Sequence, residues 1–173
     1  MEPTFEPVRD EHIPALRDIF NHYVEHSDVV FVTEPVDDAG MRAQLFFDDP
    51  RHAAFVILAD GAVAGYVSLH SFRPRAAYAD TAEVSLYLAP GRRGRGLGAA
   101  AQAFIEDYAR DQGFHALVGG IVAGNDASIA LVERFGFARV GHLREIGRKR
   151  GRWLDMLWYE KLLEPETTPP AVV

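Results

Sequence analysis

The 173-residue chain contains no cysteine. It therefore has no disulfides, no thiolate ligands for a metal and no cysteine nucleophile, so covalent transfer through an enzyme thiol is excluded. Its seven histidines have no Glu-x-x-His companion or other metal-ligand spacing, and we expect no metal site.

Long apolar runs and an excess of positive charge are also missing. No apolar run approaches the ~18 residues of a membrane span, and the opening MEPTFEPVRD lacks the basic and apolar regions of a signal peptide. Eighteen Lys and Arg against 25 Asp and Glu give a net charge of −7, which disfavours nucleic-acid binding by a basic surface. We expect a cytoplasmic protein with no nucleic-acid or membrane partner.

The residues that are present are typical of a soluble globular protein, with 48% hydrophobic and 25% charged. The length suits one domain with a sizeable core rather than two domains. We predict a single domain over residues 1–163, followed by a proline-rich, flexible tail, EPETTPPAVV, over 164–173.

Hydrophobic periodicity and turn residues predict elements in the order β-α-α-β-β-β-α-β-α-β-β. Asp10 is the expected N-cap of the first helix, and Asp60-Gly61 is the expected hairpin turn. The segment 82–124 is a βαβ unit, so the sheet is mixed and locally parallel there. The expected strands are 5–9, 53–59, 62–72, 82–89, 115–124, 137–147 and 153–163, and the expected helices are 10–26, 37–47, 97–112 and 125–136.

The stretch GRRGRGLGAAAQAF, residues 91–104, joins the carboxyl end of a predicted strand to the start of a helix. The first helical amides lack partners and the helix dipole is positive there, so the loop is a candidate anion site. No Gly-Lys-Ser/Thr follows it, and its spacing is not that of a dinucleotide fingerprint. A glycine-rich surface turn with solvated arginines is the alternative.

Within this loop, Arg93-Gly94-Arg95-Gly96-Leu97-Gly98 resembles R/Q-x-x-G-x-G/A, the pyrophosphate-binding motif of the GCN5-related N-acetyltransferases. The chain is most similar to their phosphinothricin and methionine sulfoximine N-acetyltransferase group, through IFNHYV, TEPV, SFRPRAAY, AEVSLYL and GRKRGRWLD. The resemblance runs from about residue 5 to 163. It implies an α/β fold with a central mixed, mostly antiparallel sheet of about seven strands, whose fourth and fifth strands are parallel and splayed, flanked by about four helices.

The resemblance also implies that acetyl-CoA is the co-substrate. Its pyrophosphate would lie on the amides of 94–99, and its pantetheine arm would add like a strand to the unpaired edge of the fourth strand. Asn125 matches the cofactor-contacting Asn of the family, although a plain helix N-cap explains it equally well. The implied cofactor-binding residues are Leu86, Tyr87, Leu88, Arg93, Gly94, Arg95, Gly96, Leu97, Gly98, Ala99, Asn125 and Ser128.

Acetylation of an amine requires a proton acceptor, because an amino acid's amine is mostly protonated at neutral pH. Glu83 occupies the position of the group's proposed catalytic base, and we expect it to act through a water. Partial burial would raise its pKa from the usual value of about 4.3 toward the working pH. The alternatives are that Glu83 orients the substrate ammonium or ends a strand in solvent. A backbone amide near Leu86 or Tyr87 would stabilise the oxyanion.

Arg73 and Arg75 flank Pro74 in FRPR, and arginine forks suit the carboxylate or phosphinate of an acceptor. Solvation of two loop arginines is the alternative. The resemblance implies a homodimer, with substrate-binding residues at Phe31, Thr33, Arg73, Pro74, Arg75, Glu83, Val84 and Ser85.

Three positions depart from the family pattern. Val132 stands where a Tyr or His is usual, Val84 where some relatives have His, and Arg150 where Phe or His is usual. The first departure removes the expected general acid for the leaving thiolate. One function that remains is direct acetyl transfer, in a ternary complex, to a small L-amino acid or an analogue of the phosphinothricin, methionine sulfoximine or methionine sulfone type. A non-catalytic acyl-CoA-binding domain and an acetyltransferase of protein N-termini or other small amines are the alternatives.

Overall fold

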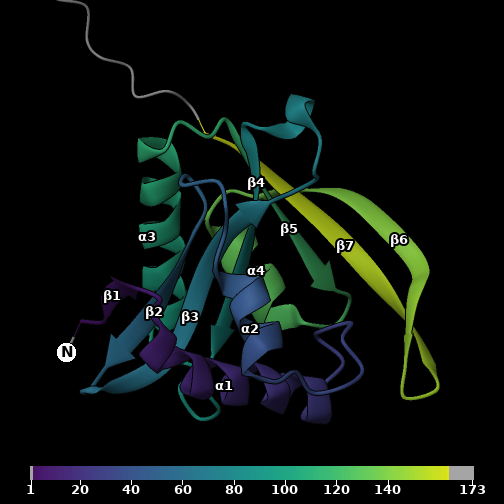
Figure 1. The fold of residues 1–173 in the computed structure, drawn as a ribbon. Coiled ribbons are helices and arrows are strands. Elements are labelled where there is room, and N and C mark those ends of the chain that lie inside the picture. Colours follow the sequence, from purple (N-terminus) through teal and green to yellow (C-terminus); the bar gives the residue numbers. More distant parts are fainter. Residues whose placement is uncertain (1, 164–173) are drawn as a thin grey trace, which may run out of the picture.

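A mixed sheet forms the centre of the molecule. The computed structural model describes residues 2–163, and their seven strands lie in the order β1-β2-β3-β4-β5-β7-β6 (Figure 1). Neighbouring strands are antiparallel except β4 and β5, which confirms the predicted sheet with one parallel pair. The strands are β1 (Thr4–Pro7), β2 (Ala53–Ala59), β3 (Ala62–Ser71), β4 (Thr81–Leu88), β5 (Ala116–Val122), β6 (Ala138–Lys149) and β7 (Arg152–Leu162).

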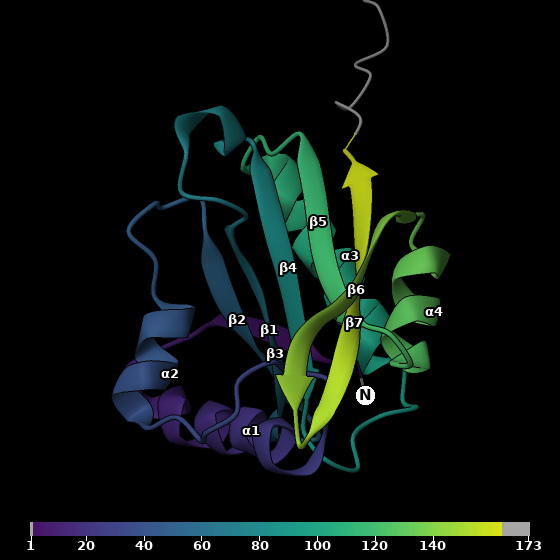
Figure 2. The ribbon, with the colours of Figure 1, turned by 90° about the vertical axis from the view of Figure 1, so that its right-hand side faces the viewer.

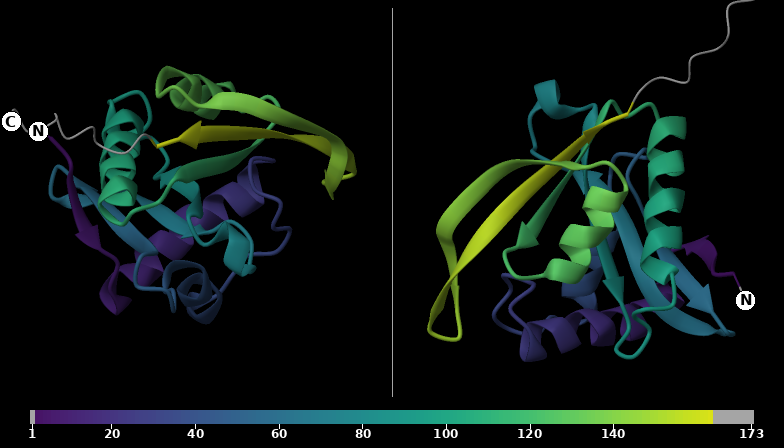
Figure 3. Two further views of the ribbon diagram at one scale, coloured as in Figure 1. Left: turned by 90° about the horizontal axis from the view of Figure 1, so that it is seen from above. Right: turned by 180° about the vertical axis from the view of Figure 1, so that it is seen from behind.

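Among the described residues, two α-helices cover each face of the sheet. On one face lie α1 (Ile13–His26) and α2 (Asp38–Leu45), and on the other lie α3 (Leu97–Asp111) and α4 (Asp126–Arg134) (Figures 2 and 3). Each pair buries an apolar stripe against its own face, so two cores lie back to back across the sheet. Two short 3-10 turns, η1 (Asp10–His12) and η2 (Ala76–Tyr78), precede α1 and β4.

The first helix begins three residues later than predicted. Asp10 opens η1, and α1 starts at Ile13 with His12 as its N-cap, so the predicted N-cap at Asp10 is wrong. An α-helix that started at Asp10 would place Pro14 in its second turn, where the proline ring meets the carbonyl of residue 10. Starting at Ile13 instead puts Pro14 in the first turn, where its missing amide proton costs nothing. The predicted apolar stripe is buried throughout: Ile13, Leu16, Ile19, Phe20, Tyr23 and Val24.

The other predicted elements are present, with small shifts at their ends. The second helix, α2, ends at Leu45 rather than at Phe47. Asp60 and Gly61 have φ angles of 54° and 73°, as a two-residue hairpin turn between β2 and β3 requires. The predicted tail at 164–173 lies outside the described residues.

The strands β4 and β5 separate after a short parallel contact (Figure 1). Their register pairs are Thr81 with Ala116, Ala82 with Leu117, and Glu83 with Val118. Beyond this contact β4 runs on to Leu88, while β5 runs on to Val122 and keeps β7 as its partner. The main-chain edges that face each other beyond Glu83 and Val118 are therefore not paired with each other, which agrees with the predicted splay.

The tip of the β6–β7 hairpin holds the segment between α1 and α2. Lys149 Nζ donates a hydrogen bond to the carbonyl of Val30 at 3.0 Å. Arg150 donates to the carbonyl of Val24 at 3.3 Å and to that of Glu25. Because the last carbonyls of a helix have no intrahelical partners, Arg150 caps the C-terminus of α1.

Gly65 lets β3 approach β4 at the end where the sheet opens. A Cβ built at this glycine would lie only 2.3 Å from the carbonyl oxygen of Tyr87 and 3.0 Å from the Cα of Leu88. Both neighbours are main-chain atoms, so they cannot move aside without shifting β4. A side chain at position 65 is therefore incompatible with the observed strand spacing.

We expect Gly65→Ala to lower the free energy of unfolding by about 1–3 kcal/mol, because the added methyl group must push β3 away from β4. Gly119→Ala is the matched control, since a Cβ at that strand position would meet no atom within 4 Å. Urea denaturation followed by circular dichroism measures both variants. Equal stability of the two variants would contradict the close approach at Gly65.

Candidate active site

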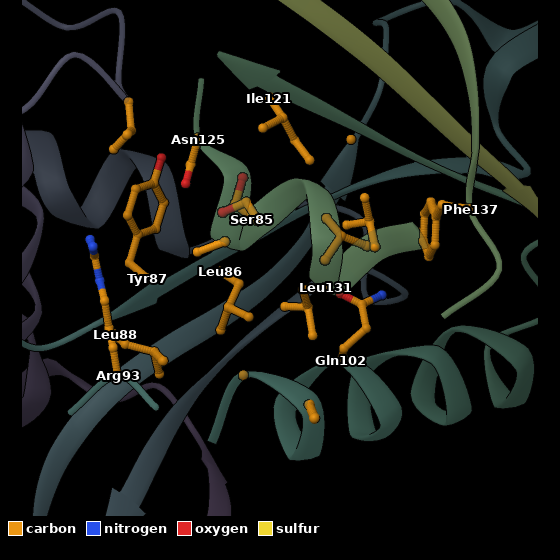
Figure 4. A pocket seen from close by; sticks show the side chains of 18 of the residues that line it. Ser85, Leu86, Tyr87, Leu88, Arg93, Gln102, Ile121, Asn125, Leu131 and Phe137 are labelled. Carbon is orange, nitrogen blue, oxygen red and sulfur yellow. The ribbon is translucent and has the colours of Figure 1, made fainter. Parts of the chain in front are cut away.

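A cavity of about 340 Å³ opens where β4 and β5 separate, between β4, the glycine loop, the start of α3, β5 and α4 (Figure 4). Most of the predicted cofactor-binding residues meet here. Of the remainder, Leu97 is buried in the core and Arg95 is exposed. The predicted site residues that line this cavity are Val84, Ser85, Leu86, Tyr87, Leu88, Arg93, Gly94, Gly96, Gly98, Ala99, Asn125 and Ser128.

The glycine loop presents a row of free amides. Within residues 2–163, no main-chain oxygen accepts a hydrogen bond from the amides of 93–99, whereas the amide of Ala100 donates to the carbonyl of Gly96. Gly94 and Gly96 have φ angles of 75° and 79°, and both have open space where a Cβ would lie. Free amides, close access and the positive end of the α3 dipole together fit a bound diphosphate.

The three arginines of the loop differ in their surroundings. Arg93 lines the cavity, with its guanidinium carbon 5.2 Å from the ring centre of Tyr23. Arg92 donates to the carboxylate of Asp60 at 3.1 Å, and Arg95 lies 3.7 Å from the same carboxylate. Asp60 therefore neutralises part of the basic patch, and Arg93 is the arginine whose charge faces the cavity.

The main chain of β4 presents alternate residues to the open edge. The amide of Ala89 donates to β3 at 2.8 Å, and because strand amides alternate in direction, those of Leu86 and Leu88 face β5. The main chain of Tyr87 faces β3, so the predicted main-chain role of Tyr87 does not fit this register, and it is the Tyr87 side chain that lines the cavity. The hydroxyl of Tyr23 donates to the carbonyl of Leu88 at 2.6 Å and fixes that end of the edge.

The N-terminus of α4 borders the same cavity. Asn125 occupies the N-cap position, but in the described part of the chain its side chain makes no capping hydrogen bond to the helix. Both Asn125 and Ser128, one turn further on, line the cavity. The capping explanation therefore accounts for the position of Asn125 but not for its side chain.

Part of the cavity wall was missed from the sequence. Gln102, one turn into α3, is 2% exposed, and its Nε2 donates to Oε1 of Glu106 at 3.0 Å (Figure 4). Gly119 and Gly120 also line the cavity, and adjacent glycines inside a strand are a pattern that indicates the close approach of a ligand. The other residues missed are Tyr23, Val29, Val118, Ile121, Ala127, Leu131 and Phe137, and Val132, which was noted as a departure from the family pattern, lines the cavity as well.

Glu83 lies in the last residue pair before β4 and β5 separate. Its side chain shares a face of β4 with Tyr87, which packs into the core beneath α1 and α2. Burial raises the pKa of Glu83, and the positive charge of Arg73 lowers it in part. Among the described residues, Glu83 is not one of those that line the cavity between β4 and β5, so it stands beside the opening rather than within it.

A second cavity of about 420 Å³ lies between α2, β3 and β4, on the α1 and α2 face of the sheet. Ser85 and Tyr87 line both cavities and so form a shared wall. His70 lines the second cavity, and its Nε2 lies 3.1 Å from Oγ of Ser85. His70 was not predicted from the sequence, because a single histidine in a strand belongs to no recognisable motif.

The remaining predicted substrate residues line neither of these two cavities. They are Phe31, Thr33, Arg73, Pro74 and Arg75, and all five are exposed. The guanidinium carbon of Arg73 lies 4.8 Å from the ring centre of Phe72. The ring of Phe31 covers Gly147 of β6, where a Cβ would lie 3.0 Å from it. The positive charge of Arg73 therefore acts on the carboxyl group of Glu83, but the five residues do not form one pocket.

None of the described helices is both long and apolar enough to cross a membrane. Across residues 2–163, the His, Asp and Glu side chains form no group of three or more that is placed to hold a metal ion.

The comparisons with known proteins agree with this geometry. The model of the Acetyltransferase (GNAT) family matches residues 13–137. The phosphinothricin N-acetyltransferase of Streptomyces coelicolor is 36% identical, over 94% of this chain and 97% of the relative. The L-methionine sulfoximine/L-methionine sulfone acetyltransferase of Pseudomonas aeruginosa is 35% identical, over 91% of this chain and 93% of the relative. The chain therefore belongs to the GNAT acetyltransferase family, as the resemblance predicted.

A solved structure shows the same fold with its co-substrate. The GNAT superfamily phosphinothricin acetyltransferase (Pat) from Sinorhizobium meliloti, in complex with AcCoA, superposes with a TM-score of 0.89. It is 27% identical, and the match covers 100% of this chain and 98% of that chain.

We expect Arg73→Ala to raise the pKa of Glu83 further, because the positive charge of Arg73 now lowers it. Arg75→Ala is the matched control, since it removes the same charge from the same exposed turn and should leave the pKa of Glu83 close to its starting value. A ¹³C NMR titration of the Glu83 carboxyl measures both variants. Equal changes in the pKa of Glu83 in the two variants would contradict a specific effect of Arg73, because the combined positive charge of the turn would then explain both.

Proposed function

We propose that this acetyltransferase moves the acetyl group of acetyl-CoA to the amine of a small L-amino acid or an analogue of the phosphinothricin, methionine sulfoximine or methionine sulfone type. The observation that carries the proposal is the row of free amides at 93–99 beside the separated strands. The names of the two relatives support the substrate class. In the proposal, transfer is direct, in a ternary complex, and the absence of cysteine excludes an acetyl-thiol intermediate on the enzyme.

In this proposal the diphosphate of acetyl-CoA lies on the amides of 94–99, and Arg93 balances its charge. The amides of the pantetheine arm pair with the main chain of Leu86 and Leu88, so that the co-substrate completes the open edge of β4. Asn125 and Ser128 contact the arm from the start of α4. The open space at Gly94 and Gly96 supports this placement, because a Cβ there would hold a phosphate away from the amides.

Glu83 serves as the base. It accepts a proton from the substrate ammonium through a water, and burial suits it to this role by raising its pKa toward the working pH. The neutral amine then attacks the thioester carbonyl in the opening between β4 and β5. The main-chain amide of Leu86 faces that opening and stabilises the oxyanion. Val132 offers no proton to the leaving group, but a simple thiol has a pKa of about 8.5, so a thiolate can leave with the help of solvent.

Arg73 and Arg75 bind the acid group of the acceptor. Arg73 is the better placed of the two, because its charge acts on Glu83 and so lies near the amine that Glu83 deprotonates. Phe31, Thr33, Val84 and Ser85 complete the acceptor site in this proposal. A free amino acid offers a carboxylate close to its amine, which suits this pair of arginines better than a protein N-terminus does.

A non-catalytic acyl-CoA-binding domain is the second candidate, and Val132 is the observation that favours it. Release of the CoA thiol, detected with DTNB, separates the two functions when acetyl-CoA is supplied with phosphinothricin, methionine sulfoximine or methionine sulfone. We expect thiol release with at least one of these acceptors. Protection of the fold by acetyl-CoA without thiol release from any of them would favour the binding domain.

Glu83→Gln is expected to lower kcat by roughly 10²-fold or more, because the amide cannot accept the proton. The Kd for acetyl-CoA should stay nearly unchanged, since Glu83 does not line the cavity between β4 and β5. Stopped-flow thiol release and isothermal titration calorimetry measure the two quantities. A turnover like that of the wild type at neutral pH would remove the assignment of Glu83 as the base.

We also propose a cytoplasmic homodimer. The co-substrate is an intracellular metabolite, and β6 is an edge strand with exposed apolar residues of the kind that mark an interface. Val140, Leu143 and Ile146 on β6 are 54%, 41% and 56% exposed, and Trp153 at the start of β7 is 57% exposed.

For the 19.2 kDa chain, sedimentation equilibrium should give a dimer, and Ile146→Lys should give a monomer, since a charge cannot be buried there unpaired. Leu162→Lys, at the other end of β7 and 58% exposed, is the matched control and should remain a dimer. A monomeric wild type, or a dimer in both variants, would contradict the proposed interface.

A further inference from the structure

We infer that Ser85 and His70 form a second proton-accepting pair, which takes the proton released when the amine attacks the thioester. The inference rests on the proposed function and deepens it. Glu83 prepares the amine, and the Ser85–His70 pair serves the step that follows.

The position of Ser85 carries the inference. Ser85, labelled in Figure 4, lines the cavity between β4 and β5, and it also lines the second cavity. Its Oγ lies 3.1 Å from Nε2 of His70, which is within the range for proton transfer between a hydroxyl and its base. Of the two cavities, His70 lines only the second. A proton that reaches Ser85 from the first cavity therefore has a direct acceptor on the second.

The surroundings of His70 keep its imidazole able to accept a proton. Burial lowers the pKa of His70, and a hydrogen bond to the backbone of Ser71 raises it in part. In the tautomer that carries its proton on Nδ1, Nε2 of His70 accepts from the hydroxyl of Ser85. The neutral form prevails at any pH above this lowered pKa. The titratable or charged groups near His70 are Glu83 on β4, His52 before β2, Tyr66 on β3, Tyr87 on β4 and Arg73 after β3.

The chemistry of acetylation calls for two proton acceptors. The substrate ammonium loses one proton to Glu83 before attack. When the nitrogen lone pair then forms the C–N bond, the nitrogen becomes positively charged and must lose a second proton. As that proton passes to Ser85 Oγ, the Ser85 hydroxyl proton passes to His70 Nε2, and the electron pair of the broken C–S bond leaves on sulfur. The products are the neutral amide, a CoA thiolate and an imidazolium at His70.

The second cavity gives the imidazolium a route for its proton. This cavity of about 420 Å³ is lined in part by polar side chains, so it suits water. Those side chains are Gln44, Ser68 and Ser71, besides His70 and Ser85. The proton leaves through this side of the sheet, away from the co-substrate, and the thiolate takes one from solvent after release.

The test is the pH dependence of turnover in His70→Gln, measured with acetyl-CoA and whichever acceptor of the panel reacts fastest. The Gln amide can keep the hydrogen bond to Ser85 but cannot accept a proton. We expect kcat to fall by roughly 10²-fold. On the acid side, log kcat against pH should rise with a limiting slope of about two in the wild type, where two groups must be unprotonated, and of about one in His70→Gln. The KM for acetyl-CoA should not change.

Ser85→Ala provides a second, independent variant, and the double variant should lose no more activity than either single one, because the two residues act as a unit. His52→Gln is the matched control, a nearby histidine outside both cavities whose pKa burial also lowers, and it should keep the wild-type slope. A wild-type slope and rate in His70→Gln, or additive losses in the double variant, would overturn the inference. Failure of the proposed function would appear in the wild type itself, as no thiol release with any acceptor, and would remove the inference with it.

Discussion

The separation of β4 from β5 after three residue pairs creates the site. A strand edge inside a protein carries amides and carbonyls that need partners, so an open edge in the middle of a sheet persists only where a ligand or solvent supplies them. The sheet stays intact elsewhere, because β5 keeps β7 on its other side and β4 keeps β3. Gly65 helps by letting β3 follow β4 closely to the end of the paired region. The opening is thus built into the strand register and does not depend on any single functional side chain.

The two faces of β4 have different surroundings, because successive side chains along a strand point to opposite faces of the sheet. Leu86 and Leu88 pack toward α3 and α4, beside the free amides of the glycine loop. Ser85 and Tyr87 point the other way and line the second cavity, and Glu83 shares their face of β4. In the proposed mechanism, the co-substrate and the proton acceptors therefore meet across one strand. At the tip of the β6–β7 hairpin, Arg150 donates a hydrogen bond to the end of α1, and Lys149 donates one to Val30 in the segment that follows α1.

The fold could be predicted from the sequence because periodicity and turn residues are local patterns, and most of the residues that the family resemblance implied for the co-substrate line the cavity between β4 and β5. The spacing of glycines in the loop is such a local pattern, whereas the direction of each main-chain group along β4 follows from the pairing with β3, which is why the main-chain role of Tyr87 was misjudged. The Asp10 cap failed because Pro14 decided where the helix starts. The pairing of Arg92 and Arg95 with Asp60, and of His70 with Ser85, joins residues far apart in sequence through strand register. Single-residue identities carry no trace of such contacts, so Arg93 and Arg95 looked equivalent and His70 went unnoticed.

The central claim is that a diphosphate binds to the main-chain amides at the start of α3. Two-dimensional ¹H–¹⁵N NMR of the protein during titration with acetyl-CoA tests it most directly, because hydrogen bonds to a phosphate shift the amide signals that donate them. The account predicts large shifts at residues 94–99 and at Leu86 and Leu88, with little change in the Asp60–Gly61 turn. Saturable binding that leaves the amides of 94–99 unmoved would contradict it.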